Sequence, residues 1–233
     1  MMRVLTLLPV LVCLSVMSTP ALARDPSLYG GLFIGDRLGK DQTFAGANAA
    51  GAARVIETPT KDGLLGGALL GAIVADAPWG RLRTEVELTN SKSNLKSLSL
   101  NGVRRELLNG RKSVSTTMLN AAYDTPKIWD RVRLTVGGGA GTAAIDYDVE
   151  YNVAATGPRI QIPTNATGKL ALQAIGGLSV EVVRNFELTA DVRYLHVNSH
   201  NVERFNLTAG TLDSVLKTKY NNASVTTGFR FLF

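Results

Sequence analysis

The sequence ends on the stretch Ala223-Ser224-Val225-Thr226-Thr227-Gly228-Phe229-Arg230-Phe231-Leu232-Phe233, which decides the fold. Phe229, Phe231 and Phe233 stand at every second position, so in an extended strand all three rings point to the same side, opposite Arg230. A strand with one aromatic face and one polar face suits a transmembrane β-barrel, because its apolar face meets lipid and its last strand pairs with the first. The alternative is a soluble β-sandwich that buries the aromatic face.

The lengths of the connections favour the barrel. Short turns near residues 77–79, 125–130 and 184–185 alternate with long polar segments at 37–61, 92–112, 147–167 and 199–217. An outer-membrane barrel has tight turns on one side of the membrane and longer loops on the other. The sequence therefore predicts an all-β fold, an eight-stranded antiparallel up-and-down transmembrane β-barrel, with strands near 28–36, 62–76, 80–91, 113–124, 131–146, 168–183 and 186–198 before the terminal one.

Alternation inside the predicted strands places charges on one face. In segment 80–91, Leu82, Val86 and Leu88 share one face and the charged residues share the other. A barrel directs the apolar face to lipid and the charges into the lumen, where they should pair because an unpaired buried charge costs several kcal/mol. Eight strands leave a lumen that side chains can fill. The predicted lumen charges are Arg81, Arg83, Glu85, Glu87, Arg131, Arg133, Glu181, Glu187, Asp191, Arg193 and Arg230.

The first 23 residues have the pattern of a secretory signal peptide. Arg3 supplies the positive charge, residues 4–17 the apolar segment, and Ala21-Leu22-Ala23 the cleavage site. We therefore expect a signal peptide at 1–23 and one outer-membrane barrel domain at 24–233. Cleavage removes Cys13, the only cysteine, which excludes disulfides and cysteine-based sites in the mature chain.

Composition narrows the remaining function classes. The formal charge of +6 falls to +5 when Arg3 is removed, and the basic residues are scattered among acidic ones rather than clustered with aromatic ones. This pattern argues against nucleic-acid binding and favours contact with anionic lipopolysaccharide headgroups. No run approaches the roughly 18 consecutive apolar residues that a membrane helix needs.

The two histidines, His196 and His200, are candidates for catalytic or metal-binding residues. The segment around His196 loosely resembles outer-membrane lipid A deacylases, which carry a lipid-facing His-x-Ser pair. The residue two after His196 is Asn198, and Ser199 would point to the other side of the strand unless a bulge intervenes. A zinc site from His196 and His200 lacks a clear third ligand. We predict no catalytic, cofactor-binding or metal-binding residues, and assign the glycine-rich segment 137–141 to a curved barrel strand rather than to a phosphate loop.

As a whole, the signal peptide, the eight strands, the alternating connections and the terminal Phe233 resemble the opacity-type and OmpA-like small outer-membrane barrels. The resemblance implies a non-enzymatic surface protein of the Gram-negative outer membrane, with both mature termini in the periplasm. Its expected partners are outer-membrane lipid and lipopolysaccharide, the barrel-assembly machinery that recognises the strand ending at Phe233, and a host or surface ligand at the four long loops. A narrow channel for ions or small solutes and a lipid A-modifying enzyme remain as alternatives.

Overall fold

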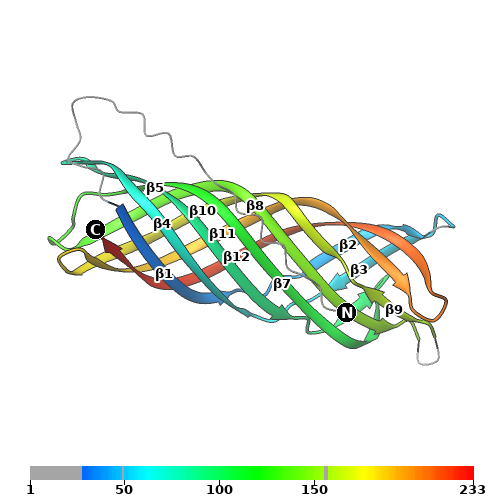
Figure 1. The fold of residues 1–233 in the computed structure, drawn as a ribbon. Helices are drawn as coiled ribbons and strands as arrows, with labels where there is room; N and C mark the ends of the chain where they lie inside the picture. The colour runs from blue at the N-terminus through cyan, green and yellow to red at the C-terminus, as the bar shows by residue number, and fades with distance from the viewer. Residues whose placement is uncertain (1–27, 49, 155–156) are drawn as a thin grey trace, which may run out of the picture.

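The structure, a computed structural model, describes residues 28–48, 50–154 and 157–233, and the regular secondary structure of these residues is entirely β-strand (Figure 1). The expected signal peptide and its cleavage site lie outside the described residues. No helix among the described residues is long and apolar enough to cross a membrane. The strands are β1 (Leu28–Arg37), β2 (Gln42–Asn48), β3 (Ala53–Thr58), β4 (Gly63–Ala77), β5 (Gly80–Asn94), β6 (Leu98–Leu100), β7 (Val103–Asp124), β8 (Val132–Asn152), β9 (Arg159–Ile162), β10 (Asn165–Val183), β11 (Phe186–Asn206) and β12 (Thr211–Leu232).

Eight of these strands close into a ring, called here the basal ring, which holds the short turns and the C-terminus. Its antiparallel order is β1–β4–β5–β7–β8–β10–β11–β12, and β12 pairs back onto β1. Tyr29 lies opposite Leu232, and the amide of Phe233 donates to the carbonyl of Leu28 at 2.9 Å. The eight-stranded barrel and the pairing of the last strand with the first are therefore confirmed.

A second closed ring continues from the first and is called here the distal ring. Its order is β2–β3–β6–β7–β8–β9–β11–β12, and β12 pairs back onto β2. The long strands β7, β8, β11 and β12 run through both rings. The strands β1, β4, β5 and β10 end at the boundary, where β2, β3, β6 and β9 take their places. In Figure 1 the distal ring is the end that carries β2, β3 and β9.

The distal ring corrects the prediction of four long loops. Segments 37–61, 92–112, 147–167 and 199–217 are largely strands, and β7 begins at Val103 rather than near residue 113. The strands were missed because the hydrophobic pattern inverts at the boundary between the rings. On β8, Leu134 and Val136 face outward in the basal ring, whereas Ile145 and Tyr147 face inward in the distal ring.

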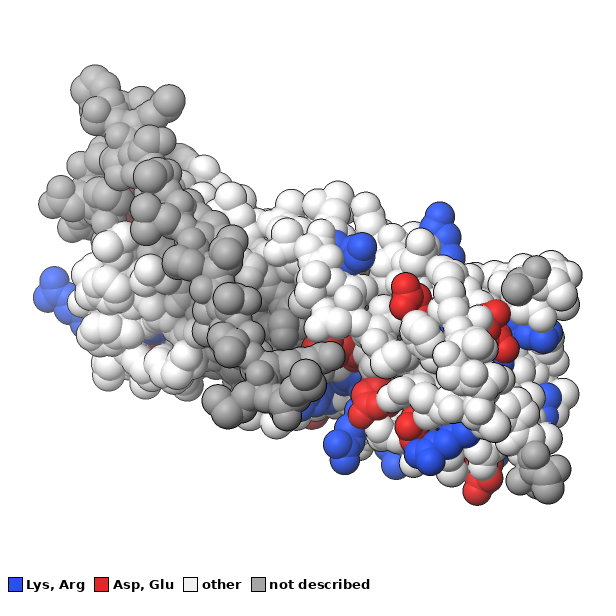
Figure 2. All heavy atoms as spheres, turned by 45° about the vertical axis from the view of Figure 1, so that its right-hand side comes forward, with Lys and Arg blue, Asp and Glu red and all other residues white. Residues whose placement is uncertain are grey.

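This inversion changes both surfaces of the wall. The exterior of the basal ring exposes large apolar side chains, such as Leu70, Leu119 and Val192, all more than half exposed. The exterior of the distal ring exposes charged ones, such as Asp148 and Glu203. Figure 2 shows charged side chains gathered toward the distal end. An apolar exterior around a polar interior suits a bilayer, while a polar exterior around an apolar interior suits water.

Tight turns close the basal end of the barrel. Trp79 and Trp129 lie in two of them and are both exposed, a position typical of aromatic residues at a membrane interface. The ring of Trp79 stacks on Tyr123 with centroids 6.3 Å apart. Gly80 after this turn has φ of 132°, and a Cβ there would lie 2.5 Å from the carbonyl of Asp124. The turn therefore requires glycine.

Candidate functional site

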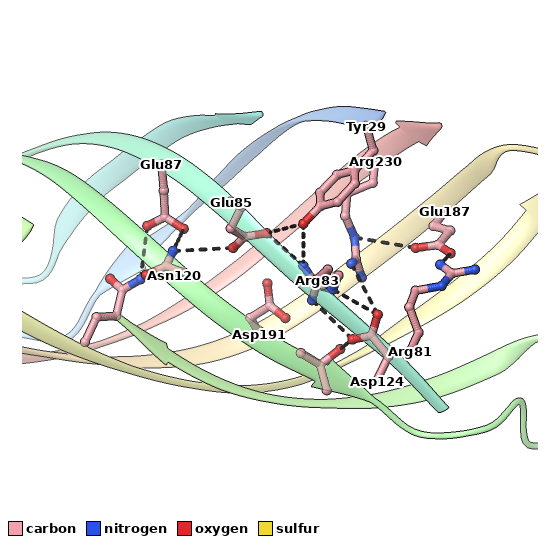
Figure 3. A network of polar contacts seen from close by, with 12 residues as sticks. Tyr29, Arg81, Arg83, Glu85, Glu87, Asn120, Asp124, Glu187, Asp191 and Arg230 are labelled. Carbon is pink, nitrogen blue, oxygen red and sulfur yellow. Dashed lines mark hydrogen bonds and ion pairs between the residues drawn. The ribbon is translucent and has the colours of Figure 1, made fainter. Parts of the chain in front are cut away.

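A network of buried charges fills the lumen of the basal ring, and Arg83 on β5 lies at its centre (Figure 3). The guanidinium donates from Nε and Nη2 to the two carboxylate oxygens of Asp124 at 2.9 and 3.2 Å, and from Nη1 to Glu85 at 2.7 Å. Asp124, fully buried at the end of β7, also accepts a bond from Thr135 at 2.7 Å. Tyr29 donates to Glu85 at 2.9 Å. The bidentate pair of Arg83 and Asp124 ties β5 to β7, and the bonds from Tyr29 and Thr135 add β1 and β8 to the same cluster.

A second group lies on the side of the network toward the distal ring. Arg193 on β11 pairs with the fully buried Glu87 at 2.5 Å and with Asp191 at 3.2 Å. The amide of Asn120 donates to Glu87 at 3.2 Å and that of Gln173 also at 3.2 Å. The guanidinium of Arg193 lies in addition 4.2 Å from the centroid of Phe33. Glu87 therefore has one cation and two amide donors around it.

A third group lies on the side toward the short turns. Arg81 pairs with Glu187 at 2.9 Å and with the half-exposed Asp76 at 3.2 Å. Arg230, on the terminal strand, lies 3.5 Å from Glu187 and 3.8 Å from Asp124. The aromatic end of the terminal strand therefore directs Arg230 into the network.

Nine of the eleven predicted lumen charges lie in this network or at its edge. Arg131 is an exception, because it is exposed in the turn before β8. Glu181 is the other, because it pairs with Lys127 at 2.5 Å where the lumen opens, with each side chain about one third exposed. Both residues stand at strand ends, where alternation no longer fixes the direction of a side chain. The prediction missed Asp124, although the alternation of its strand places it on the same side as Asn120.

The interior of the distal ring is an apolar core. Fully buried side chains from β8, including Ile145 and Tyr151, pack with side chains from the other strands of the ring. Arg204 lies in this core, donates to the hydroxyl of Tyr151 at 2.5 Å and pairs with Asp213. The other core residues are Phe44, Ile56, Leu95, Leu98, Leu100, Val114, Met118, Ala143, Tyr147, Val149, Ile160, Ile162, Ala171, Val197, Val202, Leu216 and Tyr220.

The lumen opens at the short turns, where Arg81, Arg133 and Glu187 line a pocket of about 450 Å³, but deeper inside little free space is left along the axis. A cavity beside Arg83 has a volume of about 10 Å³, and one between Arg37 and Arg193 has about 20 Å³. Such cavities are about the size that holds a single water molecule. Gly139 shows how tightly the wall packs on the network, because a Cβ there would lie 2.0 Å from Oδ1 of Asn120. The glycine-rich segment 137–141 is thus part of strand β8, as expected.

His196 and Ser199 are not joined by a hydrogen bond within the described residues. His196 faces outward, and its Nδ1 lies 2.5 Å from Oδ1 of Asn221 on β12. A register shift follows Val197, so the exposed Ser199 precedes His200, which faces inward. The Nε2 of His200 lies 3.2 Å from the hydroxyl of Tyr147, and burial lowers the pKa of its imidazole. The described residues form no cluster of three or more His, Cys, Asp or Glu side chains that could hold a metal ion.

No protein-family model matches the sequence, and no curated protein matches it. Solved structures do share the fold. The outer membrane protease OmpT from Escherichia coli aligns over 89% of this chain and 97% of its own, with a TM-score of 0.54 and 9% identity. A major outer membrane protein from Thermus thermophilus aligns over 88% and 99%, with a TM-score of 0.52 and 13% identity. By fold, the chain is an outer-membrane β-barrel.

Neisserial surface protein A also aligns, over 88% of this chain and 97% of its own, with a TM-score of 0.48 and 14% identity. At these identities the likeness is one of fold, so the activity in the name of OmpT does not transfer with it. The fold does identify the two surfaces of the wall. The apolar exterior of the basal ring is the lipid-facing belt, and the distal ring stands beyond the bilayer.

Proposed function

We propose that the protein is a closed, non-enzymatic surface protein of the outer membrane, whose distal ring serves adhesion or envelope integrity. In this proposal both mature termini are periplasmic and the distal ring is extracellular. The observation that supports it most is that side chains fill the lumen of both rings. Paired charges fill the basal ring, inside the lipid-facing belt, and an apolar core fills the distal ring. A wall filled in this way can hold its outer end rigidly, and it leaves no room for a hydrated solute in the small cavities along the axis described above.

The outer end offers an exposed apolar surface for contact. Leu207, Leu212 and Val215 are each more than 40% exposed around the β11–β12 turn. Apolar side chains that remain exposed at the tip of a rigid element are typical of interaction surfaces. Asp213 lies between them in sequence but turns toward Arg204, so it does not interrupt the patch.

Two measurements test the closed barrel and the role of the tip. Refolded protein in a planar bilayer should be electrically silent while protease protection shows that it is inserted, and steady discrete openings would contradict the proposal in favour of the narrow channel. Laboratory bacteria that display the chain should attach better to surfaces coated with extracellular-matrix protein. Leu212→Asp should lower that attachment, whereas Thr211→Ala, an exposed neighbour, should leave it unchanged. Equal attachment by bacteria without the chain would refute the adhesion role and leave envelope integrity to be tested by detergent sensitivity.

The non-enzymatic part of the proposal rests on the hydrogen bond between His196 and Asn221. A general base needs its nucleophile within hydrogen-bond reach, and the neighbour of His196 here is an amide. Expression of the chain, and of His196→Ala, should leave the mass spectrum of lipid A identical. Loss of an acyl chain with the natural sequence, restored by His196→Ala, would identify the protein as a lipid A-modifying enzyme.

A further inference from the structure

The wall of the barrel is interrupted where β1 gives way to β2. Residues 224–232 of β12 pair with β1, and residues 214–217 of β12 pair with β2. Residues 218–223 of β12 therefore have no paired strand on that side. Side-chain bonds bridge part of this gap. The amide of Asn222 donates to the carbonyl of Leu38 at 2.7 Å, and the hydroxyl of Thr218 donates to the backbone carbonyl of Thr43 at 2.8 Å. The remaining space is a pocket of about 320 Å³ that opens through the wall.

Cationic side chains surround this pocket. Lys40 from the β1–β2 connection and Lys219 from β12 line it near the exterior, and Lys112 reaches it from β7, a strand elsewhere in the ring. Asp41 is the one carboxylate in the lining. The nearby Asp62 accepts a hydrogen bond from the backbone amide of Gly39 at 2.6 Å, which partly compensates the charge of its carboxylate.

Two buried cations have no carboxylate partner within the described residues: Lys112, which lines the pocket, and Arg37, which lies behind its lining residue Tyr220. Lys112 is 4% exposed, and its Nζ donates to Gln42 at 3.1 Å and Thr60 at 3.3 Å. Arg37 is 3% exposed and donates to Tyr220 at 2.7 Å and to Ser91 at 3.1 Å. Arg37 also donates to Ser93, and all five acceptors of the two cations are neutral. This arrangement differs from the lumen network, in which Arg81, Arg83, Arg193 and Arg230 all lie within 4 Å of carboxylates.

Burial and the neighbouring charge of Arg37 lower the pKa of Lys112 to about 7. The aromatic ring of Tyr220, 5.2 Å from Nζ, gives only part of the stabilisation that an anion would supply. A buried cation with neutral acceptors only is not neutralised. If it lines an open cavity, an anion that enters the cavity can pair with it and stabilise it.

The position of the pocket along the barrel axis indicates which anions can reach it. Below it, Ile34 and Leu38 of β1 and its continuation are about half exposed and belong to the lipid-facing belt. Above it, Lys217 and Lys219 face outward into the polar exterior. The opening therefore lies at the edge of the belt, where the phosphate groups of an outer leaflet come within reach of the wall.

We infer that this pocket is a binding site for a phosphate monoester group, held between Lys112 and the rim lysines. The doubly charged phosphate would complement the net positive lining and would accept bonds from Lys112 in place of its neutral acceptors. The group can be carried by a lipid A headgroup or be free in solution. Only the lipid source depends on the orientation given under the proposed function, whereas binding of a phosphate depends on the pocket alone.

The test uses the refolded chain in a phosphate-free maltoside detergent, with calorimetric titration of inorganic phosphate, of lipid A in mixed micelles and of dephosphorylated lipid A. We expect phosphorylated lipid A, inorganic phosphate or both to bind, and dephosphorylated lipid A not to bind. If only phosphorylated lipid A binds, the lipid headgroup is the source of the phosphate group. If inorganic phosphate also binds, the pocket is a site for free anions as well. Lys112→Met should weaken the affinity at least tenfold, and Lys92→Met, an exposed lysine on the exterior of β5, should leave it unchanged.

A second measurement does not depend on the folding of a variant. At about pH 8.5 the phosphate is already a dianion and Lys112 is mostly neutral, so phosphate binding to the natural sequence should take up a proton, which calorimetry detects as a heat that depends on the buffer. The inference is overturned if neither phosphate nor lipid A binds, if dephosphorylated lipid A binds equally well, or if no proton is taken up. An affinity that is unchanged in a folded Lys112→Met would also overturn it.

Discussion

Replacing Arg83 by methionine tests whether the lumen network holds the barrel together. Methionine keeps much of the side-chain length but removes the guanidinium, which makes three hydrogen bonds to Asp124 and Glu85. Both carboxylates are at most 4% exposed, so the change leaves two buried charges without their main partner. Breaking a buried pair in this way costs about 3–5 kcal/mol.

The remaining donors place the expected loss at the lower end of that range. Arg230 stays 3.8 Å from Asp124, Thr135 still donates to Asp124, and Tyr29 still donates to Glu85. We therefore expect Arg83→Met to lower the free energy of unfolding by about 3 kcal/mol. The double variant Arg83→Met/Asp124→Asn should lose about 1–2 kcal/mol less free energy of unfolding than the two single variants lose in sum. The reason is that Asp124→Asn removes one of the two carboxylates that Arg83→Met leaves unpaired.

The assay is urea unfolding of the protein in lipid vesicles, followed by the fluorescence of Trp79 and Trp129 in the turns. Arg131→Met is the matched control, because Arg131 is an exposed arginine of the same barrel, and its effect should stay within about 0.5 kcal/mol. A loss below about 1 kcal/mol for Arg83→Met, or strict additivity in the double variant, would show that the network contributes little. The barrel would then be held by strand pairing and lipid contact.

Three further predictions follow from the same structure. Phe233→Ser should reduce assembly into the outer membrane, measured as heat-modifiable folded barrel per cell, because the ring is 64% exposed on the lipid-facing side; normal assembly would refute that role. Ile145→Ala in the distal core should cost about 2–4 kcal/mol in the same unfolding assay, and Val136→Ala in the belt on the same strand much less, whereas equal losses would contradict the inverted pattern. Lys112 has a folded pKa of about 7 and an unfolded pKa near 10.4, so the unfolded chain binds more protons between these values. The free energy of unfolding should therefore rise by about 2 kcal/mol from pH 7 to pH 9. Lys112→Met should lack this rise, and an identical pH profile would refute the assignment.

The sequence was sufficient to predict the part of the fold that meets lipid. Alternation in segments 80–91 and 186–198 identified strands, and the same alternation directed Arg83, Glu87 and Arg193 into the lumen, as the structure confirms. Pairing between particular charges was beyond prediction, because it depends on the stagger between strands. Arg193 meets Glu87 across the lumen, 106 residues away in the chain.

The distal ring was missed for a physical reason. In a membrane-spanning strand the apolar side chains are on the outward face, whereas beyond the boundary between the rings they are on the inward face. Val149 and Tyr151 alternate with Asp148 and Glu150 as clearly as any pair within the belt, but with the opposite meaning. The pocket at the ring boundary was equally hidden, because Arg37 and Lys112 meet there only after the chain has passed through both rings.

The continuity of β7, β8, β11 and β12 through both rings has a consequence for how the exposed end of this protein can change. A surface made of free loops can vary at every position, whereas a surface made of strands can vary only at alternate ones. Immune or phage pressure on the distal ring would act on residues such as Asp148, Glu203 and Lys217, while their sequence neighbours Val149, Val202 and Leu216 are constrained by the core. Diversification should therefore leave a two-residue rhythm of variable and constant positions, with unrestricted change confined to the hairpin tips.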